Sequence, residues 1–151
     1  MDDEAVLSFI RKQAAQAKYV MSVCTGALIC GAAGLLQGRR ATTNWAVFHL
    51  LKYFGAIPVN ERVVMDGNYV STAGVSAGID GALLMVAVLR GPRVAQQIQL
   101  YIEYAPEPPF SAGSPKTAPP DLVEAAQNAG RAMAEARFAT AKRIAQLGLG
   151  S

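Results

Sequence analysis

Cysteine and histidine are scarce in this chain of 151 residues. It contains two cysteines, Cys24 and Cys30, and a single histidine, His49. Two cysteines this close together cannot form a disulfide framework, and with one histidine they lack the spacing of a metal site. We therefore expect a chain without disulfide, metal or other cofactor, in a reducing, cytoplasmic setting.

The chain also lacks long apolar runs and blocks of charge. Its apolar run at residues 27–36 is too short to cross a bilayer, and the acidic start from Met1 to Glu4 is unlike the basic start of a signal peptide. The net charge is +3, but the basic residues are scattered along the sequence. We expect no export signal, no membrane span and no nucleic-acid partner.

The chain does have enough apolar material for a core, because 52% of its residues are hydrophobic and 17% are charged. Together with the length, this composition predicts one globular domain over residues 1–151. Apolar residues at helical intervals predict a helix over 3–18. The β-prone residues 19–23 predict a strand that turns at once into a helix over 25–36.

The second half of the chain repeats this order of strand and helix. Asp66, Gly67 and Asn68 separate two extended segments and predict a hairpin. The predicted elements are strands at 61–65 and 69–73, helices at 77–89 and 93–104, a proline-rich loop at 106–120 and a terminal helix at 121–147. This order indicates an α/β domain with a mainly parallel sheet. Because three or four strands make a thin sheet, we expect the fold to be incomplete at the amino terminus.

Cys24 lies between the first predicted strand and its helix, with Ser22 two positions before it and Gly26 two positions after it. Small residues on both sides permit the tight turn of a nucleophile elbow, which exposes the reactive side chain. At a helix start, unpaired amides and the helix dipole favour the thiolate. The amides of Thr25 and Gly26 could also hold negative charge on a substrate atom, as an oxyanion hole does.

The alternative is that Cys24 is a small buried hydrophobic residue, which is the commoner role of a free cysteine. Its position alone leaves both interpretations open. Cys30, further along the predicted helix, fits the buried role rather than a catalytic one.

Four stretches of the sequence resemble the ThiJ/PfpI superfamily. SVCTGAL at residues 22–28 and the stretch at 31–45 are similar to the region around its nucleophile, and 74–83 continues the match. These three are shared by isocyanide hydratases and by the amidase-like domains of AraC-type regulators. The proline-rich stretch at 99–115 is more selective, because it is similar to the end of the isocyanide hydratases.

The resemblance covers essentially the whole chain but lacks the amino-terminal third of the family. It implies a flavodoxin-like three-layer sandwich of the class I glutamine amidotransferase type. It also implies a hydro-lyase in which the Cys24 thiolate attacks the terminal carbon of an isocyanide, forms a thioimidate and releases an N-substituted formamide after water adds. Cys24 and its neighbour Thr25 would be the catalytic residues, an isocyanide the small-molecule partner, and the assembly a homodimer.

The sequence departs from the family pattern at three places. Members with protease activity have histidine where this chain has Thr25, which argues against a protease. Relatives commonly have histidine in place of Asn44. The family carboxylate that hydrogen-bonds the nucleophile has no counterpart, since Asp2, Asp3 and Glu4 lie in the first turn of a predicted helix.

Gly74 and Val75 begin the second strand-to-helix turn, at the end of the sheet where such folds bind ligands. We expect them to line the substrate pocket. His49 lies in a predicted helix over 45–53, and we expect it at the surface or core edge rather than as a base for Cys24. Two other functions stay open: the sensory domain of an AraC-type transcription regulator, and a redox or carbonyl-stress protein with Cys24 as its reactive thiol.

Overall fold

The computed structural model describes residues 1–148, so the last three residues of the expected 1–151 domain lie outside the described part. At its centre is a sheet in which β1 (Val20–Val23) pairs in parallel with β5 (Tyr69–Thr72), and β5 pairs antiparallel with β4 (Val63–Asp66). A second, short parallel pair joins β2 (Arg40–Ala41) to β3 (Ile57–Pro58). Two of these three pairings are parallel, as the alternation of strands and helices predicts.

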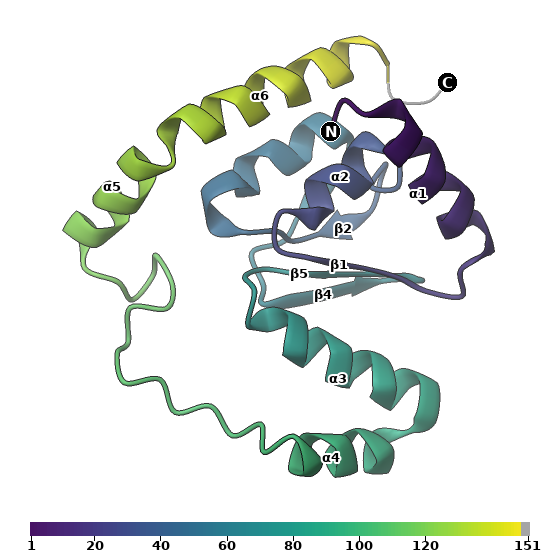
Figure 1. The fold of residues 1–151 in the computed structure, drawn as a ribbon, viewed down its shortest axis with the longest axis vertical. Helices are drawn as coiled ribbons and strands as arrows, with labels where there is room; N and C mark the ends of the chain where they lie inside the picture. The colour runs from purple at the N-terminus through teal and green to yellow at the C-terminus, as the bar shows by residue number, and fades with distance from the viewer. Residues whose placement is uncertain (149–151) are drawn as a thin grey trace.

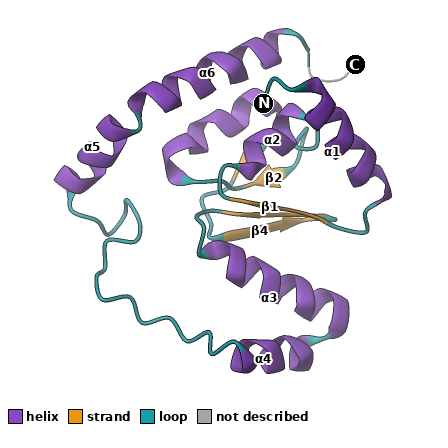
Figure 2. Ribbon diagram, viewed as in Figure 1, coloured by secondary structure: helices purple, strands orange, loops and turns teal. Residues whose placement is uncertain are grey.

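The helices cover both faces of the central sheet (Figure 1). On one side lie α1 (Glu4–Gln16), α2 (Gly26–Ala32) and the 3₁₀ helix η1 (Trp45–Phe54). On the other side lies α3 (Ala77–Arg90), with α4 (Pro92–Tyr101) packed against it. The last two helices, α5 (Pro120–Ala129) and α6 (Arg131–Gln146), form an arch in which α6 packs on η1. Helices on both faces of a mainly parallel sheet give the predicted flavodoxin-like, three-layer architecture (Figure 2).

The hairpin of β4 and β5 forms where the sequence predicts it. Asp66 and Tyr69 are opposite each other, and Gly67 in the turn has φ of 59°, a left-handed conformation that glycine adopts without strain. The Asp66 carboxylate accepts a hydrogen bond of 2.7 Å from the Arg40 amide. This bond attaches the short β2 strand to the end of the hairpin.

The second helix is shorter than the predicted 25–36, because α2 ends at Ala32. Gly34 has φ of 83°, and its amide bonds the Gly31 carbonyl while the Leu35 amide bonds the Cys30 carbonyl. This pair of hydrogen bonds is the Schellman motif that terminates many helices. Gly34 therefore ends the helix four residues before Gly38, the glycine that sequence reasoning assigns to this role.

The stretch 121–147, expected as one terminal helix, consists of α5 and α6, which meet at Gly130. Glycine is a poor helix former, by about 1 kcal/mol relative to alanine, so a break there is favourable. Beyond the break, Phe138 of α6 packs edge to face on Tyr53 of η1, with ring centroids 5.5 Å apart. Ala141 of α6 is fully buried. α6 is thus attached to the body by its own contacts.

The main hydrophobic core lies between α2 and η1. Leu28, Leu50, Leu51 and Phe54 are at most 1% exposed there. α2 approaches η1 closely because Gly31 has no side chain: a Cβ at this position would lie 2.6 Å from Cγ of Phe54. The absence of one methyl group therefore sets the spacing between these two helices.

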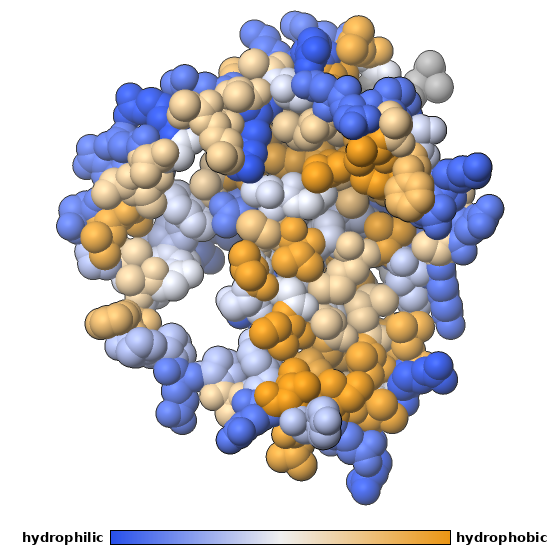
Figure 3. All heavy atoms as spheres, in the orientation of Figure 1, coloured by the Kyte–Doolittle hydropathy of each residue, from blue (hydrophilic) through white to orange (hydrophobic). Residues whose placement is uncertain are grey.

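The side of the molecule formed by α3 and α4, across the sheet from this core, leaves many apolar side chains uncovered. Figure 3 shows them gathered over α3 and α4. The exposed large residues of this surface are Ile79, Leu84, Val88, Leu89, Val94, Ile98, Leu100 and Tyr101. A surface of this kind is typical of contact with another polypeptide. None of the helices within residues 1–148 is both long enough and apolar enough to cross a membrane.

Replacing Gly31 with alanine should destabilise the fold. A helical alanine gains about 1 kcal/mol of intrinsic propensity, but overpacking against the fully buried Phe54 costs about 1–3 kcal/mol. We expect a lower urea midpoint for Gly31→Ala by circular dichroism. The control is Gly113→Ala, where a Cβ meets nothing within 4 Å and stability should change by less than about 0.5 kcal/mol. Equal midpoints for the two variants would refute the packing argument.

Candidate active site

The turn at Cys24 has an unusual backbone. β1 ends at Val23, and Cys24 then adopts φ of 56°, in the left-handed region that residues other than glycine rarely adopt. Among the described residues, Glu103 is the only other residue besides glycine with positive φ. Such strain costs about 1–3 kcal/mol and is concentrated at functional sites. The geometry is the strand-to-helix elbow that the spacing of small residues predicts.

Hydrogen bonds from two other segments hold this turn. The Cys24 amide donates to the Thr72 carbonyl at 3.1 Å, which continues the β1–β5 ladder by one residue. The Cys24 carbonyl accepts from the Thr43 hydroxyl at 2.8 Å, and Thr43 is buried. Thr42, the preceding residue, is tied to β5 through its amide and the Ser71 hydroxyl at 2.9 Å. The elbow is therefore clamped between β5 and the segment that follows β2.

The two amides that follow Cys24 are free of protein partners. Within residues 1–148, the Ala27 and Leu28 amides bond the carbonyls of Cys24 and Thr25, but the Thr25 and Gly26 amides have no recorded acceptor. Unpaired amides are expected at a helix start. They lie beside a cysteine that is only half-buried. The interpretation of Cys24 as a sealed core residue is therefore wrong.

Cys30 has the contrasting environment. Its side chain is 9% exposed and packs near Tyr69, whose hydroxyl donates to Ser22 Oγ at 2.7 Å. Burial raises the pKa of the Cys30 thiol, and a hydrogen bond with Tyr69 offsets part of that rise. A buried thiol with a raised pKa is a weak nucleophile at neutral pH. Cys30 is a core residue, as its place along the chain predicts.

The parallel pairing of β1 with β5 brings the second predicted turn to the same end of the sheet. Val23 is opposite Thr72, so Gly74 and Val75 follow β5 at the edge where Cys24 follows β1. Val75 is 79% exposed, and Gly74 is partly buried. Neither residue lines the cavity next to Thr25. Their role as pocket residues stays a prediction.

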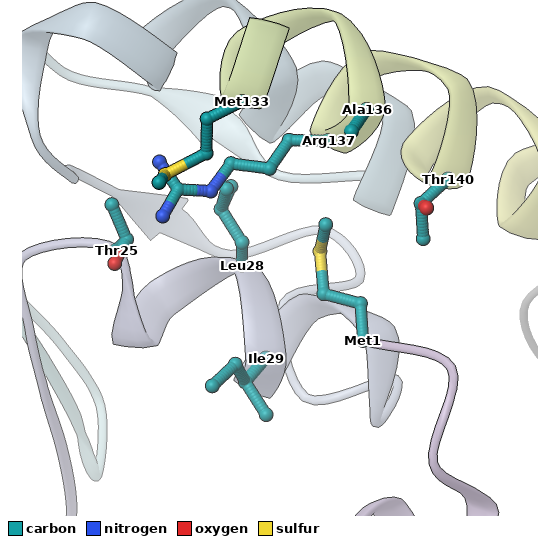
Figure 4. Close-up of a pocket in the computed structure, with 8 residues that line it drawn as sticks. All are labelled: Met1, Thr25, Leu28, Ile29, Met133, Ala136, Arg137 and Thr140. Atoms are coloured by element: carbon teal, nitrogen blue, oxygen red, sulfur yellow. The ribbon is translucent and has the colours of Figure 1, made fainter. Parts of the chain in front are cut away.

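A cavity of about 340 Å³ opens beside Thr25, between α2 and α6 (Figure 4). Eight residues line it: Met1, Thr25, Leu28, Ile29, Met133, Ala136, Arg137 and Thr140. Sequence reasoning missed the four that belong to α6, because nothing in their spacing links them to an elbow more than a hundred residues earlier. Only the fold of α6 back over the body brings the two together.

The remaining polar residues named from the sequence have structural roles. Asn44 caps η1 by accepting from the Ala46 amide at 3.0 Å. Asp3 caps α1, and Asp2 pairs with Arg143 of α6. His49 is exposed on η1, and no hydrogen bond joins it to Cys24 in the described structure. Nowhere in residues 1–148 do three histidine, cysteine or acidic side chains gather in a way that could hold a metal ion.

A family model for the DJ-1/PfpI family matches residues 1–88, which include the elbow, the hairpin and most of α3. The chain belongs to the DJ-1/PfpI family. It is 59% identical over 127 residues to the isonitrile hydratase of Pseudomonas putida, in a match that covers 84% of this chain and 56% of that protein. Isonitrile is another name for isocyanide, so the resemblance to isocyanide hydratases is confirmed.

A solved structure gives the same picture of the fold. The crystal structure of a ThiJ/PfpI family protein from Pseudomonas syringae superimposes with a TM-score of 0.88 at 47% identity, covering 93% of this chain and 57% of that one. This chain thus spans little more than half the length of both relatives. The HTH-type transcriptional regulator CdhR of Pseudomonas aeruginosa is more distant, at 31% identity over 62% of this chain.

The two cysteines of this DJ-1/PfpI domain should differ sharply in reactivity. Iodoacetamide at neutral pH should modify Cys24 and spare Cys30, because only Cys24 is partly exposed and burial raises the pKa of Cys30. Peptide mass spectrometry of native and urea-unfolded protein measures both sites. The Cys24→Ser variant should take up no label until it unfolds. Equal labelling of both thiols in the native protein would contradict the assignment.

Proposed function

We propose that this chain carries the nucleophile of an isocyanide hydratase and converts an isocyanide and water to an N-substituted formamide. The observation that carries the proposal is the left-handed, half-exposed Cys24. It occurs in a chain 59% identical to an isonitrile hydratase over most of its length. Because the chain spans 56% of that relative, the activity of this chain is part of the proposal.

The chemistry proceeds in two steps. In the first, the Cys24 sulfur bonds to the terminal carbon of the isocyanide and that carbon gains a proton, which gives a thioimidate. In the second, water adds to the carbon–nitrogen double bond, the nitrogen gains a proton, and the carbon–sulfur bond breaks. The products are the formamide and the regenerated thiol, so no cofactor is consumed.

Thr25 and Gly26 have the supporting roles. Their amides have no protein acceptor within residues 1–148, so they would be free to stabilise the negative charge that develops as water adds and as sulfur leaves. The Thr25 hydroxyl makes no capping bond to the helix, so it is available to orient the attacking water. Gly74 and Val75, at the same end of the sheet, would border the path of the substrate.

The described residues offer little support for the proton transfers that both steps require. No titratable side chain within residues 1–148 hydrogen-bonds Cys24, and Asp2, Asp3 and Glu4 are engaged elsewhere. The first step therefore depends on the proton of the thiol itself or on water. In the second step the attacking water must lose a proton, and no described carboxylate is placed to accept it, so we expect formation of the adduct to be easier for this chain than rapid turnover.

The other functions have less support. A sensory domain of an AraC-type regulator corresponds to a match at 31% identity over 96 residues, against 59% over 127 for the hydratase. The redox or carbonyl-stress function stays a prediction, and its test is selective oxidation of Cys24 by mild peroxide. A cytoplasmic location and a homodimer complete the proposal. The dimer is supported by the uncovered apolar residues of α3 and α4.

Incubation with a neutral aryl isocyanide should add the mass of one isocyanide to the chain, with N-aryl formamide accumulating in solution. Intact mass spectrometry and chromatography measure the two products. Cys24→Ala should show neither, while Cys30→Ala should show both. Thr25→Val keeps the shape of the side chain but loses the hydroxyl, and should slow formamide release about tenfold. Equal formamide production with and without Cys24 would sink the proposed mechanism.

The homodimer can be tested by sedimentation velocity over a range of concentrations. We expect a dimer whose dissociation is promoted by Ile98→Asp or Leu100→Asp, because both side chains are exposed on α4. A charged residue at Leu147, which is exposed at the end of α6, is the matched control and should leave the dimer intact. A monodisperse monomer for the unaltered chain would contradict this part of the proposal.

A further inference from the structure

The cavity between α2 and α6 combines an apolar wall with one charged side chain. Met1, Leu28, Ile29 and Met133 supply most of the wall, and Arg137 is the charged residue that lines it. In Figure 4 the Arg137 side chain leaves α6 and extends across the cavity toward α2, between Met133 and Leu28 and on the side of Thr25. A charged side chain in an apolar recess is typical of a site that recognises a ligand with an apolar body and a group of opposite charge.

The position of Arg137 is fixed by the helix that carries it. Phe138 packs on Tyr53, and Ala141 is fully buried. Arg143, six residues beyond Arg137 on the same helix, pairs with Asp2. These contacts lie directly after Arg137 and around Thr140 on α6. They hold the helix so that the face carrying Arg137 is turned toward the cavity.

Arg137 has no ion-pair partner among the described residues. Within residues 1–148 the ion pairs are those of Arg11 with Glu4, Arg62 with Asp80 and Arg143 with Asp2, and Arg137 has no hydrogen-bond acceptor. The side chain is nevertheless half-buried. A partly desolvated guanidinium gains most from a carboxylate, which it binds with two parallel hydrogen bonds.

The carboxylate of Asp2 does not compete for Arg137. Asp2 follows Met1, but its carboxylate accepts from Arg143 and from the Thr140 hydroxyl at the far end of the cavity. Arg137 is therefore the charged side chain of this cavity that has no partner within residues 1–148, and an incoming anion would be drawn to it.

We propose that this cavity holds the body of the substrate, and that the preferred isocyanides carry a carboxylate that Arg137 binds. The apolar part of such a molecule would contact Leu28, Ile29 and Met133, and its isocyano carbon, at the end opposite the carboxylate, would have to reach Cys24, the residue before Thr25. A volume of about 340 Å³ accommodates one substituted aromatic ring or an aliphatic chain of similar size. This inference rests on the proposed hydratase function for its chemistry, but the binding of a carboxylate is testable without turnover.

The test compares two pairs of ligands on the full chain. 4-Formamidobenzoate and 4-formamidobenzamide, a product and its uncharged counterpart, report binding by calorimetry or ligand-observed NMR. 4-Isocyanobenzoate and 4-isocyanobenzamide report kcat/KM for formamide production. We expect the carboxylate of each pair to bind more tightly and to react with the higher kcat/KM. Arg137→Gln should weaken binding of the carboxylate about tenfold and lower kcat/KM for the carboxylate about tenfold, with little effect on either amide.

Two further variants separate charge from structure. Arg137→Lys keeps the cation but not the paired donors, and should fall between the unaltered chain and Arg137→Gln. Arg131→Gln is the matched control on the same helix, because Arg131 bonds Asn128 and does not line the cavity. It should bind both carboxylates as the unaltered chain does.

The outcomes distinguish this inference from the proposed function. Arg137-dependent binding of 4-formamidobenzoate without any turnover would support the anion site and refute the proposed hydratase function. Cys24-dependent hydration with no preference for the carboxylates would support the hydratase and overturn the role of Arg137. Equal binding of carboxylate and amide, or no binding of either, would likewise overturn it.

Discussion

The left-handed backbone of Cys24 is the constraint on which the candidate site depends. It persists because hydrogen bonds hold it on both sides. The Cys24 amide donates to the Thr72 carbonyl and so continues the β1–β5 ladder, and the Cys24 carbonyl accepts from the Thr43 hydroxyl. Two glycines of α3 let this helix pack closely against the ends of β1 and β5. A Cβ on Gly78 would lie 3.0 Å from Val23, and one on Gly81 would lie 2.4 Å from Thr72. The close approach of α3 thus fixes the last residue of both strands.

Local sequence signals predicted those parts of the fold that neighbouring residues determine. The hairpin follows from the conformation that Gly67 permits, and the elbow from small residues on both sides of Cys24. The short β2–β3 pair was not predicted, and two further errors concern helix ends. Gly34 and Gly130 look like ordinary glycines in apolar or alanine-rich sequence, and only the hydrogen bonds around the first and the tertiary packing after the second reveal that each ends a helix.

The candidate site was predictable only in part for the same reason. Cys24, Thr25 and Gly26 are consecutive, so a motif can identify them. Four of the eight residues that line the cavity come from α6, and the position of α6 depends on the packing of Phe138 and Ala141 against the body. Long-range packing of this kind leaves no signature in residue spacing. The unpaired charge of Arg137 could be recognised only once that packing was known.

The independent attachment of α6 has a consequence for how this protein can diverge. Residues 105–119 connect α4 to the arch without helix or strand of their own, while α6 is secured by Phe138, Ala141 and Arg143. The place of α6 beside the cavity is thus set by contacts of the helix itself rather than by the path of the connecting segment. Substitutions on α6 that keep Phe138, Ala141 and Arg143 could therefore change the lining of the cavity without loosening the helix.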